Sequence, residues 1–387
     1  MFQKKEVTKL YIGVYYTVVG YLGGHMKQLG ISVFPEHTTT ERVYEYIRLA
    51  GSLGFKRIFT CFLSVQESKE DLVKNFKEFC DVAHEAGMIV AADTNPEVFA
   101  HIGATPYDLT IFHEIGLDII RLDGNFGAEG DAAITRNPYG IKIEYNSSGP
   151  QSIDHLIECG ADRENMCMCS NFYPQRHTGM SIARYSELNE RYLKERMRIA
   201  TFVTSQEKNT FGPWPVYDGL PTLEMHRDLP IDLQVRHLNA MNLCQDFIIG
   251  NCFASKEELE TLAHTDLSKI NMKVDFVDDL TDTEKEIIFW DKHTSRADSN
   301  DLIIRSTMTR VVFKGKSIPA RSEEGFTAHR GDVIIVNDNL EHYRGELWVV
   351  LQEMELSNQY NLVGHLAAHE DILLDYIKPA SAWGIIK

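Results

Sequence analysis

Short apolar runs recur along the first two thirds of the chain, and each ends in a polar or acidic tip. Most runs are followed by apolar residues at helical spacing, such as Val43, Ile47 and Ala50 after the first run. The runs occupy residues 29–34, 57–62, 88–93, 118–123, 141–146, 166–171, 199–205 and 247–251. Strands that alternate with helices predict a parallel sheet. Eight such units fit one closed (β/α)8 barrel, the TIM barrel, in an α/β protein.

Capping residues mark where several of the helices begin. Thr39 or Thr40 is expected to cap the first, and Ser68, with Asp71 three residues later, the second. Ser255 is expected to cap the helix that follows the eighth strand.

The pattern changes at about residue 271, where short strands separated by Gly and Asn turns replace the strand–helix alternation. A helix is predicted over 282–291. The predicted strands are 273–277, 302–307, 331–337, 345–352, 362–367 and 373–377. We therefore expect an N-terminal extension at 1–25, a barrel domain at 26–270 and a smaller β-rich domain at 271–387.

The N-terminal extension has three lysines followed by an apolar stretch over residues 10–22. Three interpretations stay open. Met26 is the true start, or the stretch adds an element that plugs the bottom of the barrel, or it is a secretory signal. The stretch is too short to span a bilayer, and no cleavage site of small residues follows it.

Two long loops interrupt the barrel rhythm, at 172–181 and 206–230. Long loops in compact domains are usually functional or disordered. The second loop contains Trp214, Tyr217 and Phe211, which argue against disorder. We expect it to form a lid or a substrate platform.

The charge balance and the cysteines narrow the class of protein. The net charge of −17 argues against nucleic acid or an anionic membrane surface as the main partner. The seven cysteines are odd in number and form no CxxC pair, which indicates free thiols in a reducing compartment. We therefore expect a cytoplasmic protein.

Carboxylates stand at the ends of four predicted strands: Glu36, Asp93, Asp123 and Glu144. In a TIM barrel these ends form the active-site face. Strands four and five are neighbours about 4.8 Å apart, so Asp123 and Glu144 can approach each other. Paired carboxylates suit glycosidic hydrolysis as acid and nucleophile or base. Either of the other two could instead be the acid or orient sugar hydroxyls.

Polar side chains at other strand ends suit sugar or phosphate recognition. Asn146 shares a strand face with Glu144, and Asn171, Tyr173 and Gln175 follow strand six. Strands seven and eight end near Ser205 and Asn251, where barrels often bind phosphate. Hydrogen bonds within the loops are the alternative role for all of these groups.

Lys142 supports a rival chemistry. A lysine that faces the barrel axis and is kept neutral by burial can form a Schiff base, as in an aldolase. An ion pair with Glu144 or Asp123 is the competing interpretation. No motif predicts a metal or another cofactor, because HExxH and GxGxxG are both absent.

Seven segments in order resemble one family: LGISVFPEH, GFKRIFTCFLS, RLDGNFG, NPYGIKIEYN, NFYPQRHTG, FGPWPVYDGLPTLEMHR and FIIGN. The family is that of the 6-phospho-N-acetylmuramidases, formerly sometimes called outer surface protein. The resemblance runs from about Leu29 to the C-terminus. It implies a TIM barrel followed by a cyclophilin-like domain, which need not imply prolyl isomerase activity.

The resemblance also implies a substrate, a phosphorylated amino-sugar disaccharide. The expected reaction cleaves 6-phospho-N-acetylmuramyl-β-1,4-N-acetylglucosamine in cell-wall sugar recycling. Its phosphate and lactyl carboxylate suit arginine, so Arg305 or Arg310 of the second domain is expected to hold them. Self-association stays open, and a non-enzymatic surface carbohydrate-binding protein is a further alternative.

Overall fold

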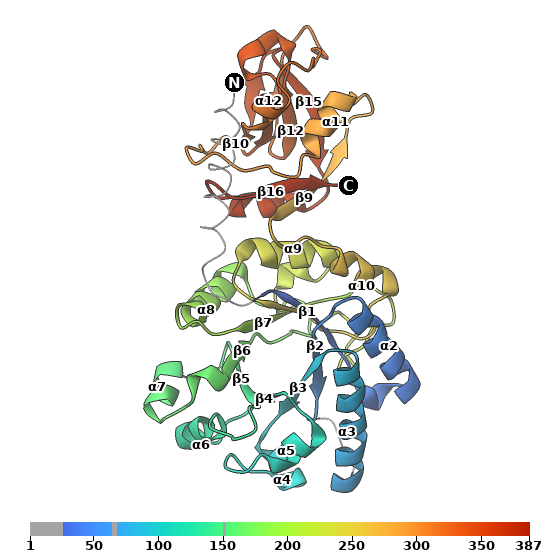
Figure 1. Cartoon of the computed structure of the whole chain (residues 1–387), viewed down its shortest axis with the longest axis vertical. Helices are drawn as coiled ribbons and strands as arrows, with labels where there is room; N and C mark the ends of the chain where they lie inside the picture. The colour runs from blue at the N-terminus through green and yellow to red at the C-terminus, as the bar shows by residue number, and fades with distance from the viewer. Residues whose placement is uncertain (1–25, 64–67, 150–151) are drawn as a thin grey trace, which may run out of the picture. The chain divides into compact units, whose positions relative to one another are not determined.

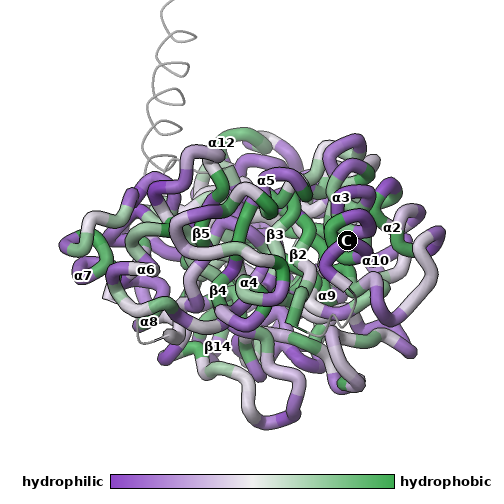
Figure 2. The backbone as a smooth tube through the Cα atoms, turned by 90° about the horizontal axis from the view of Figure 1, so that it is seen from below, coloured by the Kyte–Doolittle hydropathy of each residue, from purple (hydrophilic) through white to green (hydrophobic). Residues whose placement is uncertain are grey.

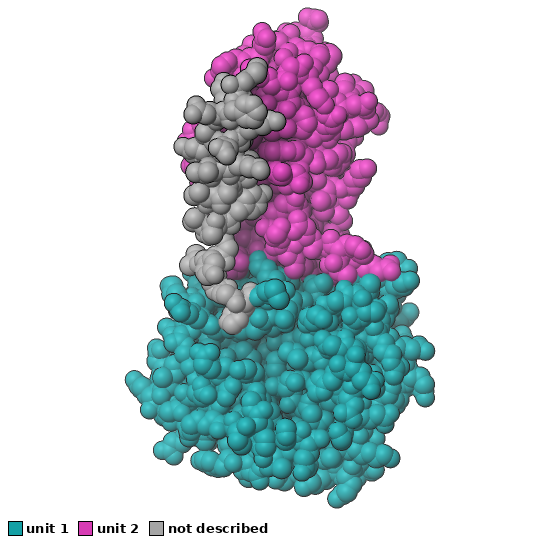
Figure 3. Space-filling view, viewed as in Figure 1, with its two compact units in different colours: residues 1–227, 243–259 teal, residues 228–242, 260–387 magenta. Residues whose placement is uncertain are grey.

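The computed structural model describes residues 26–63, 68–149 and 152–387, so the expectations for residues 1–25 lie outside the described residues. The chain divides into two compact units (Figure 3). Unit 1 comprises the chain up to Arg227 together with Leu243–Leu259. Unit 2 comprises Asp228–Asn242 and Glu260–Lys387, and so takes in the helix that follows the seventh strand.

Unit 1 contains the predicted barrel, closed because its last strand pairs in parallel with its first (Figure 1). All eight predicted strands are confirmed. Their bounds are β1 Gln28–Ser32, β2 Arg57–Cys61, β3 Ile89–Thr94, β4 Ile119–Leu122, β5 Lys142–Asn146, β6 Met166–Cys169, β7 Ile199–Val203 and β8 Asp246–Ile249.

Helices and short 3-10 turns connect these strands. They are η1 Pro35–His37, α2 Thr40–Ser52, α3 Lys69–Glu85, α4 Pro96–Ile102, α5 Thr110–Ile115, α6 Gly127–Ile134, α7 Ile153–Glu158, η2 Arg163–Asn165, α8 Ile182–Lys194, η3 Glu224–His226, α9 Ile231–Met241 and α10 Lys256–Ala263. The predicted caps are confirmed, because Thr39, Ser68 and Ser255 each accept a hydrogen bond from a backbone N–H of the first turn.

Alternation of side chains along the strands builds the core of the barrel. Figure 2 shows hydrophobic residues at β2 and β3 and a mixture of hydrophobic and hydrophilic residues along α3. An aromatic cluster that includes Phe34, Phe59 and Phe202 fills the inside of the barrel beside polar residues. No helix in the described part of the chain is long and apolar enough to cross a membrane.

Unit 2 contains a six-stranded sheet in the order β10-β13-β12-β15-β9-β16 and a two-stranded sheet of β11 and β14. Its elements after α10 are β9 Ile270–Phe276, α11 Asp282–Ile288, β10 Ile303–Ser306, α12 Thr309–Val312, β11 Phe326–Ala328, β12 Asp332–Val336, η4 Asp338–Tyr343, β13 Leu347–Val350, β14 Met354–Leu356, β15 Tyr360–Leu366, η5 Glu370–Tyr376 and β16 Trp383–Ile386. The cyclophilin-like fold stays a prediction.

One predicted strand of unit 2 is wrong. Residues 373–377 lie in the 3-10 helix η5 and its C-cap. Leu373 and Leu374 are both buried, whereas adjacent residues of a strand point to opposite faces. The turn begins at Glu370, whose buried carboxylate accepts from both terminal nitrogens of Arg236 at 2.5 Å. This ion pair favours a turn that the apolar pattern alone did not indicate.

Candidate active site

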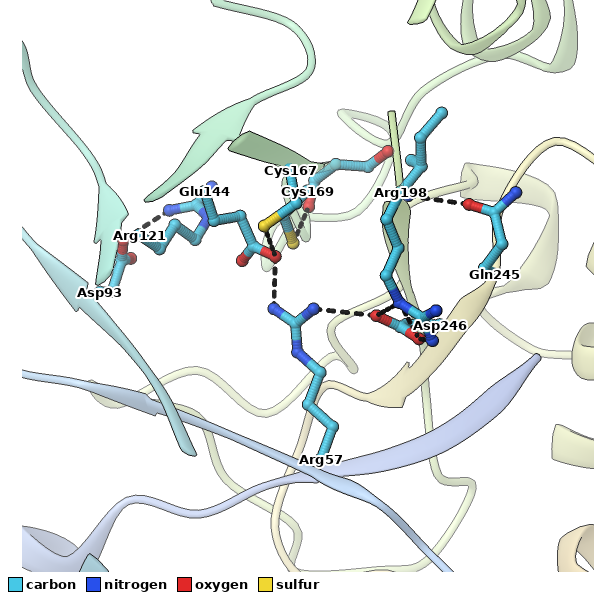
Figure 4. Close-up of polar contacts among 11 residues, drawn as sticks. Arg57, Asp93, Arg121, Glu144, Cys167, Cys169, Arg198, Gln245 and Asp246 are labelled. Atoms are coloured by element: carbon cyan, nitrogen blue, oxygen red, sulfur yellow. Dashed lines mark hydrogen bonds and ion pairs between the residues drawn. The ribbon is translucent and has the colours of Figure 1, made fainter. Parts of the chain in front are cut away.

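Charged residues also lie inside the barrel, and one group of them is centred on Arg57 (Figure 4). Arg57 donates to Glu144 at 2.5 Å and to Asp246 at 3.0 Å. Arg198 also donates to Asp246, through Nε at 3.0 Å. Burying a charge is costly unless it is paired, so this network neutralises its own members. Sequence reasoning missed Arg57; the only signal was a charged residue at the start of an otherwise apolar run.

A second network lies where strands β3 to β6 end, and its centre is Arg121. One nitrogen of Arg121 donates to Asp93 at 2.5 Å, and the other donates to Asn171 at 2.5 Å. The same oxygen of Asn171 accepts from Asn146 at 2.9 Å. Asp123 lies 3.9 Å from Arg121. The structure therefore brings four predicted site residues together around one guanidinium, at the carboxyl ends of the strands.

The two aspartates of this network have different surroundings. Asp93 is 6% exposed, and burial raises its pKa to about 6; the charge of Arg121 opposes this rise, and that of Asp123 adds to it. Asp123 directly follows β4, and its side chain is 47% exposed. One carboxyl group therefore keeps its proton up to mildly acidic pH, and the other is open to solvent.

Glu144 was expected to approach Asp123 at the strand ends, but in the structure it pairs with Arg57 inside the barrel. Its side chain is fully buried, and it contacts Arg57 and the thiol of Cys167, 3.8 Å away. Strand alternation placed it correctly on the inner face, but Arg57 holds it within the barrel. Glu36 lies in η1, with its carboxylate 3.8 Å from His37.

Aromatic rings form a platform at the same end of the barrel. Trp214, in the 206–230 loop, is 42% exposed, and its ring lies 6.0 Å from that of Phe172. Phe172 in turn packs edge-on against Phe59 and Phe202 inside the barrel. The indole is thus anchored on the core while one part of it faces solvent, an arrangement suited to the apolar face of a sugar ring.

An ion pair that sequence reasoning missed holds the two long loops together. Glu224 and Arg227 pair with an N–O distance of 2.6 Å. Glu224 also accepts from the backbone N–H groups of His177 and Gly179, both at 2.8 Å. These bonds, led by those from Arg227, lower the pKa of Glu224 to about 2.

The Arg227 guanidinium completes this connection. It donates to the carbonyl oxygens of Tyr173, Gln175 and Asp218. The predicted residues Tyr173 and Gln175 are therefore fixed through their backbone, on a loop beside the 206–230 segment. Glu and Arg are common in loops, so the three-residue spacing of Glu224 and Arg227 did not by itself predict that they join the two loops.

Ser205 and Asn251, expected to bind phosphate, are buried and hydrogen-bonded within unit 1. Ser205 donates to Glu258 at 2.5 Å. Asn251 accepts from Thr204 and from the Ser205 N–H, and donates to Thr210. These bonds occupy the polar atoms that a phosphate would need, and the Glu258 carboxylate would repel it.

Lys142 does not meet the requirement of a Schiff-base lysine. Its side chain is exposed, and Nζ donates to the Glu164 carbonyl at 2.7 Å and to Asn165 at 3.1 Å. The expected burial and the alternative ion pair with Glu144 or Asp123 are both wrong, because Lys142 begins β5 at the amino-terminal end of the barrel. It lines a cavity of about 960 Å³ there, opposite the end where TIM barrels carry their chemistry.

Arg305 and Arg310 lie together in unit 2. Their terminal nitrogens are 3.7 and 3.6 Å from the carboxylate of Glu346. The expectation that one of them holds the substrate's anionic groups stays a prediction.

Comparisons with known proteins identify the family of the chain. A family model described as 6-phospho-N-acetylmuramidase, N-terminal, matches residues 29–264, and its C-terminal counterpart matches residues 270–386. The chain is 39% identical to an uncharacterised B. cereus protein of known structure, with a TM-score of 0.86 over 94% of this chain and all of the other. A conserved Enterococcus faecalis protein of unknown function has the same fold at 24% identity, with a TM-score of 0.69 over 93% and 96% of the two chains. No curated protein sequence matches the chain.

Proposed function

The chain belongs to the 6-phospho-N-acetylmuramidase family and is a glycosidase, and from this premise we propose its substrate and its catalytic groups. The proposed substrate is 6-phospho-N-acetylmuramyl-β-1,4-N-acetylglucosamine, which is cleaved to N-acetylmuramic acid 6-phosphate and N-acetylglucosamine. The proposed setting is the cytoplasm, in recycling of cell-wall sugars. In support, all seven cysteines are free, as in proteins of reducing compartments.

The observation that carries the mechanism is the contrast between two carboxyl groups that share Arg121. Asp93, with its pKa raised to about 6, is the proton donor to the leaving sugar oxygen. Asp123, half exposed and 3.9 Å from Arg121, is the partner that acts as nucleophile or as base toward water. Arg121 contacts both groups and is not the acid, because the charge of Asp93 and the hydrogen bond to it help to raise its pKa and it keeps its proton.

Substrate binding is assigned to groups that the structure leaves accessible. Trp214 stacks on a sugar ring, and Asn146 and Asn171 lie beside the carboxyl groups, where they contact hydroxyl or acetamido groups. For the phosphate we favour Arg176 and His177, which are exposed on the loop fixed by Glu224 and Arg227. Glu144 is assigned a structural role, as the buried partner of Arg57. Glu36 stays an alternative acid.

The test of the proposed function is turnover of the phosphorylated disaccharide compared with its unphosphorylated form. We expect the kcat/KM for the phosphorylated form to be at least 100-fold higher, because one charge-assisted phosphate contact accounts for about that factor. Equal turnover of the two forms, or turnover of neither, would contradict the proposal. NMR of the first-formed product's anomer then distinguishes retention from inversion, and a thiazoline inhibitor tests the route in which the 2-acetamido group is the nucleophile.

A further inference from the structure

Unit 2 contains a buried carboxylate that its neighbours only partly satisfy. Glu346 directly precedes β13 and is 1% exposed. Its Oε1 accepts a hydrogen bond from the indole N–H of Trp348 at 3.2 Å. Its Oε2 has no hydrogen-bond partner among the described residues. A buried carboxylate oxygen without a hydrogen-bond donor lowers the stability of the fold, so this atom is a candidate acceptor for a ligand.

The arginines nearest to Glu346 do not supply that donor. Arg305 and Arg310 stay 3.7 and 3.6 Å from the carboxylate, beyond hydrogen-bond length. Within residues 26–63, 68–149 and 152–387, neither guanidinium donates a hydrogen bond. Their side chains are 25% and 27% exposed. Two guanidinium groups therefore lie together at a partly open surface, near Glu346 and with Asp298 close enough for the charge of Arg305 to act on it, and each has five N–H donors.

Aromatic rings border the same place. Arg305 lies directly opposite Trp348 in the β10–β13 register, so the two side chains are neighbours on one face of the sheet. The Trp348 ring lies 4.8 Å from that of Tyr360. Arg310 lies over the ring of Tyr343, 5.1 Å from its centre, and Tyr343 is 43% exposed. The surroundings thus offer ring faces as well as charge.

We propose that unit 2 has its own binding site for a hydroxylated organic anion of the sugar phosphate class. The anionic oxygens accept hydrogen bonds from Arg305 and Arg310, and a hydroxyl of the ligand donates to Oε2 of Glu346. The sugar ring lies against Trp348 and Tyr343. The negative charge of Glu346 makes the site selective, because an anion without a hydroxyl meets repulsion there and has no donor to offset it. This site is independent of the chemistry proposed for the barrel.

The test uses the full chain labelled with 5-fluorotryptophan and observed by ¹⁹F NMR. The sequence has four tryptophans, which Trp→Phe variants assign: Trp214, Trp290, Trp348 and Trp383. We expect glucose 6-phosphate to shift the Trp348 resonance saturably, with binding at least tenfold weaker for sulfate, which has no hydroxyl, and for uncharged glucose. Ligand bound in the barrel would instead move Trp214.

Variants separate a binding site from a structural ion pair. The double variant Arg305→Gln/Arg310→Gln should weaken glucose 6-phosphate binding at least tenfold, whereas Arg330→Gln, which removes a half-exposed arginine of the same unit paired with Asp375, should leave it unchanged. Arg305→Lys/Arg310→Lys keeps the charges and should retain part of the binding. Glu346→Gln should strengthen sulfate binding and reduce the preference for the sugar phosphate.

An unchanged resonance of Trp383, which is fully buried in unit 2, shows that each variant is folded. The proposal is overturned by a Trp348 resonance that does not move with glucose 6-phosphate. It is equally overturned by a shift of the same size with sulfate, or by a shift that persists in the Arg305→Gln/Arg310→Gln variant.

Discussion

Two aspartates that share one arginine carry the proposed chemistry at the scale of single residues. Sequence reasoning placed Asp93 and Asp123 at strand ends, because the apolar runs show where each strand stops. It paired Asp123 with Glu144, because the two residues lie on neighbouring strands. Alternation along the strands cannot show which charged groups pair inside a barrel. Arg57 donates to Glu144 at 2.5 Å, and this contact keeps the Glu144 carboxylate inside the barrel, away from solvent. Which carboxylate Arg57 contacts depends on the positions of side chains that are far apart in the sequence.

The raised pKa of Asp93 predicts a pH profile. The protonated acid is present below about pH 6 and is lost as the pH rises through that value. We therefore expect kcat/KM for the disaccharide to fall about tenfold per pH unit above about pH 6. The check is a profile of initial rates between pH 4 and 9. A kcat/KM that stays constant from pH 5 to 8 would exclude Asp93 as the acid.

At the scale of elements, the two long loops act together because Glu224 and Arg227 join them. Their length and aromatic content predicted a functional role. Their mutual fixation could not be predicted, because Arg227 binds backbone carbonyls, which every loop offers. Gly179 is part of this arrangement, since a Cβ atom there would lie 2.5 Å from the Glu224 carboxylate.

The lowered pKa of Glu224 predicts a contribution to acid stability. Its folded-state pKa of about 2 lies below the ordinary 4.5, so its stabilising effect is complete above pH 4.5 and is lost as the pH falls toward 2. Glu224→Gln should flatten the pH dependence of the urea midpoint in that window and raise KM at neutral pH.

The matched control for this prediction is Glu187→Gln, which removes an exposed carboxylate paired with Arg184 on helix α8. Such surface pairs contribute little to stability. If both variants show the same acid dependence as the parent protein, the ion pair does not fix the loops.

At the scale of the whole molecule, the barrel and the β-rich second unit follow from the change in sequence pattern near residue 271. The strands β11, β14 and β16 were missed, whereas the other five strands of the six-stranded sheet were predicted as short apolar runs between turns. The strand order was not, because antiparallel partners are chosen by packing between residues far apart in the chain. The misassigned segment at 373–377 shows the same limit, since the buried pair of Arg236 and Glu370 spans more than a hundred residues.

The buried network in unit 1 predicts a stability effect distinct from catalysis. Glu144→Gln leaves Arg57 with Asp246 as its remaining charged partner and should lower the free energy of unfolding by about 3–5 kcal/mol. The folded fraction should keep kcat within about tenfold of the parent protein. Urea denaturation of the full chain measures the free energy of unfolding, and initial rates at low temperature measure kcat. A stable Glu144→Gln protein without activity would restore Glu144 as a catalytic group.

The central claim, that Asp93 donates the proton, is tested most directly by Asp93→Asn on two substrates. One is the phosphorylated disaccharide, and the other is the 2,4-dinitrophenyl β-glycoside of N-acetylmuramic acid 6-phosphate, in which dinitrophenolate replaces N-acetylglucosamine as a leaving group that needs no proton. We predict that kcat on the disaccharide falls about 10²–10⁴-fold, while single-turnover cleavage of the dinitrophenyl glycoside stays within about tenfold of the parent rate. Asp81→Asn, on the exposed surface of α3, serves as the control and should change neither rate. Full activity of Asp93→Asn on the disaccharide, or equal loss on both substrates in a folded protein, would contradict the account.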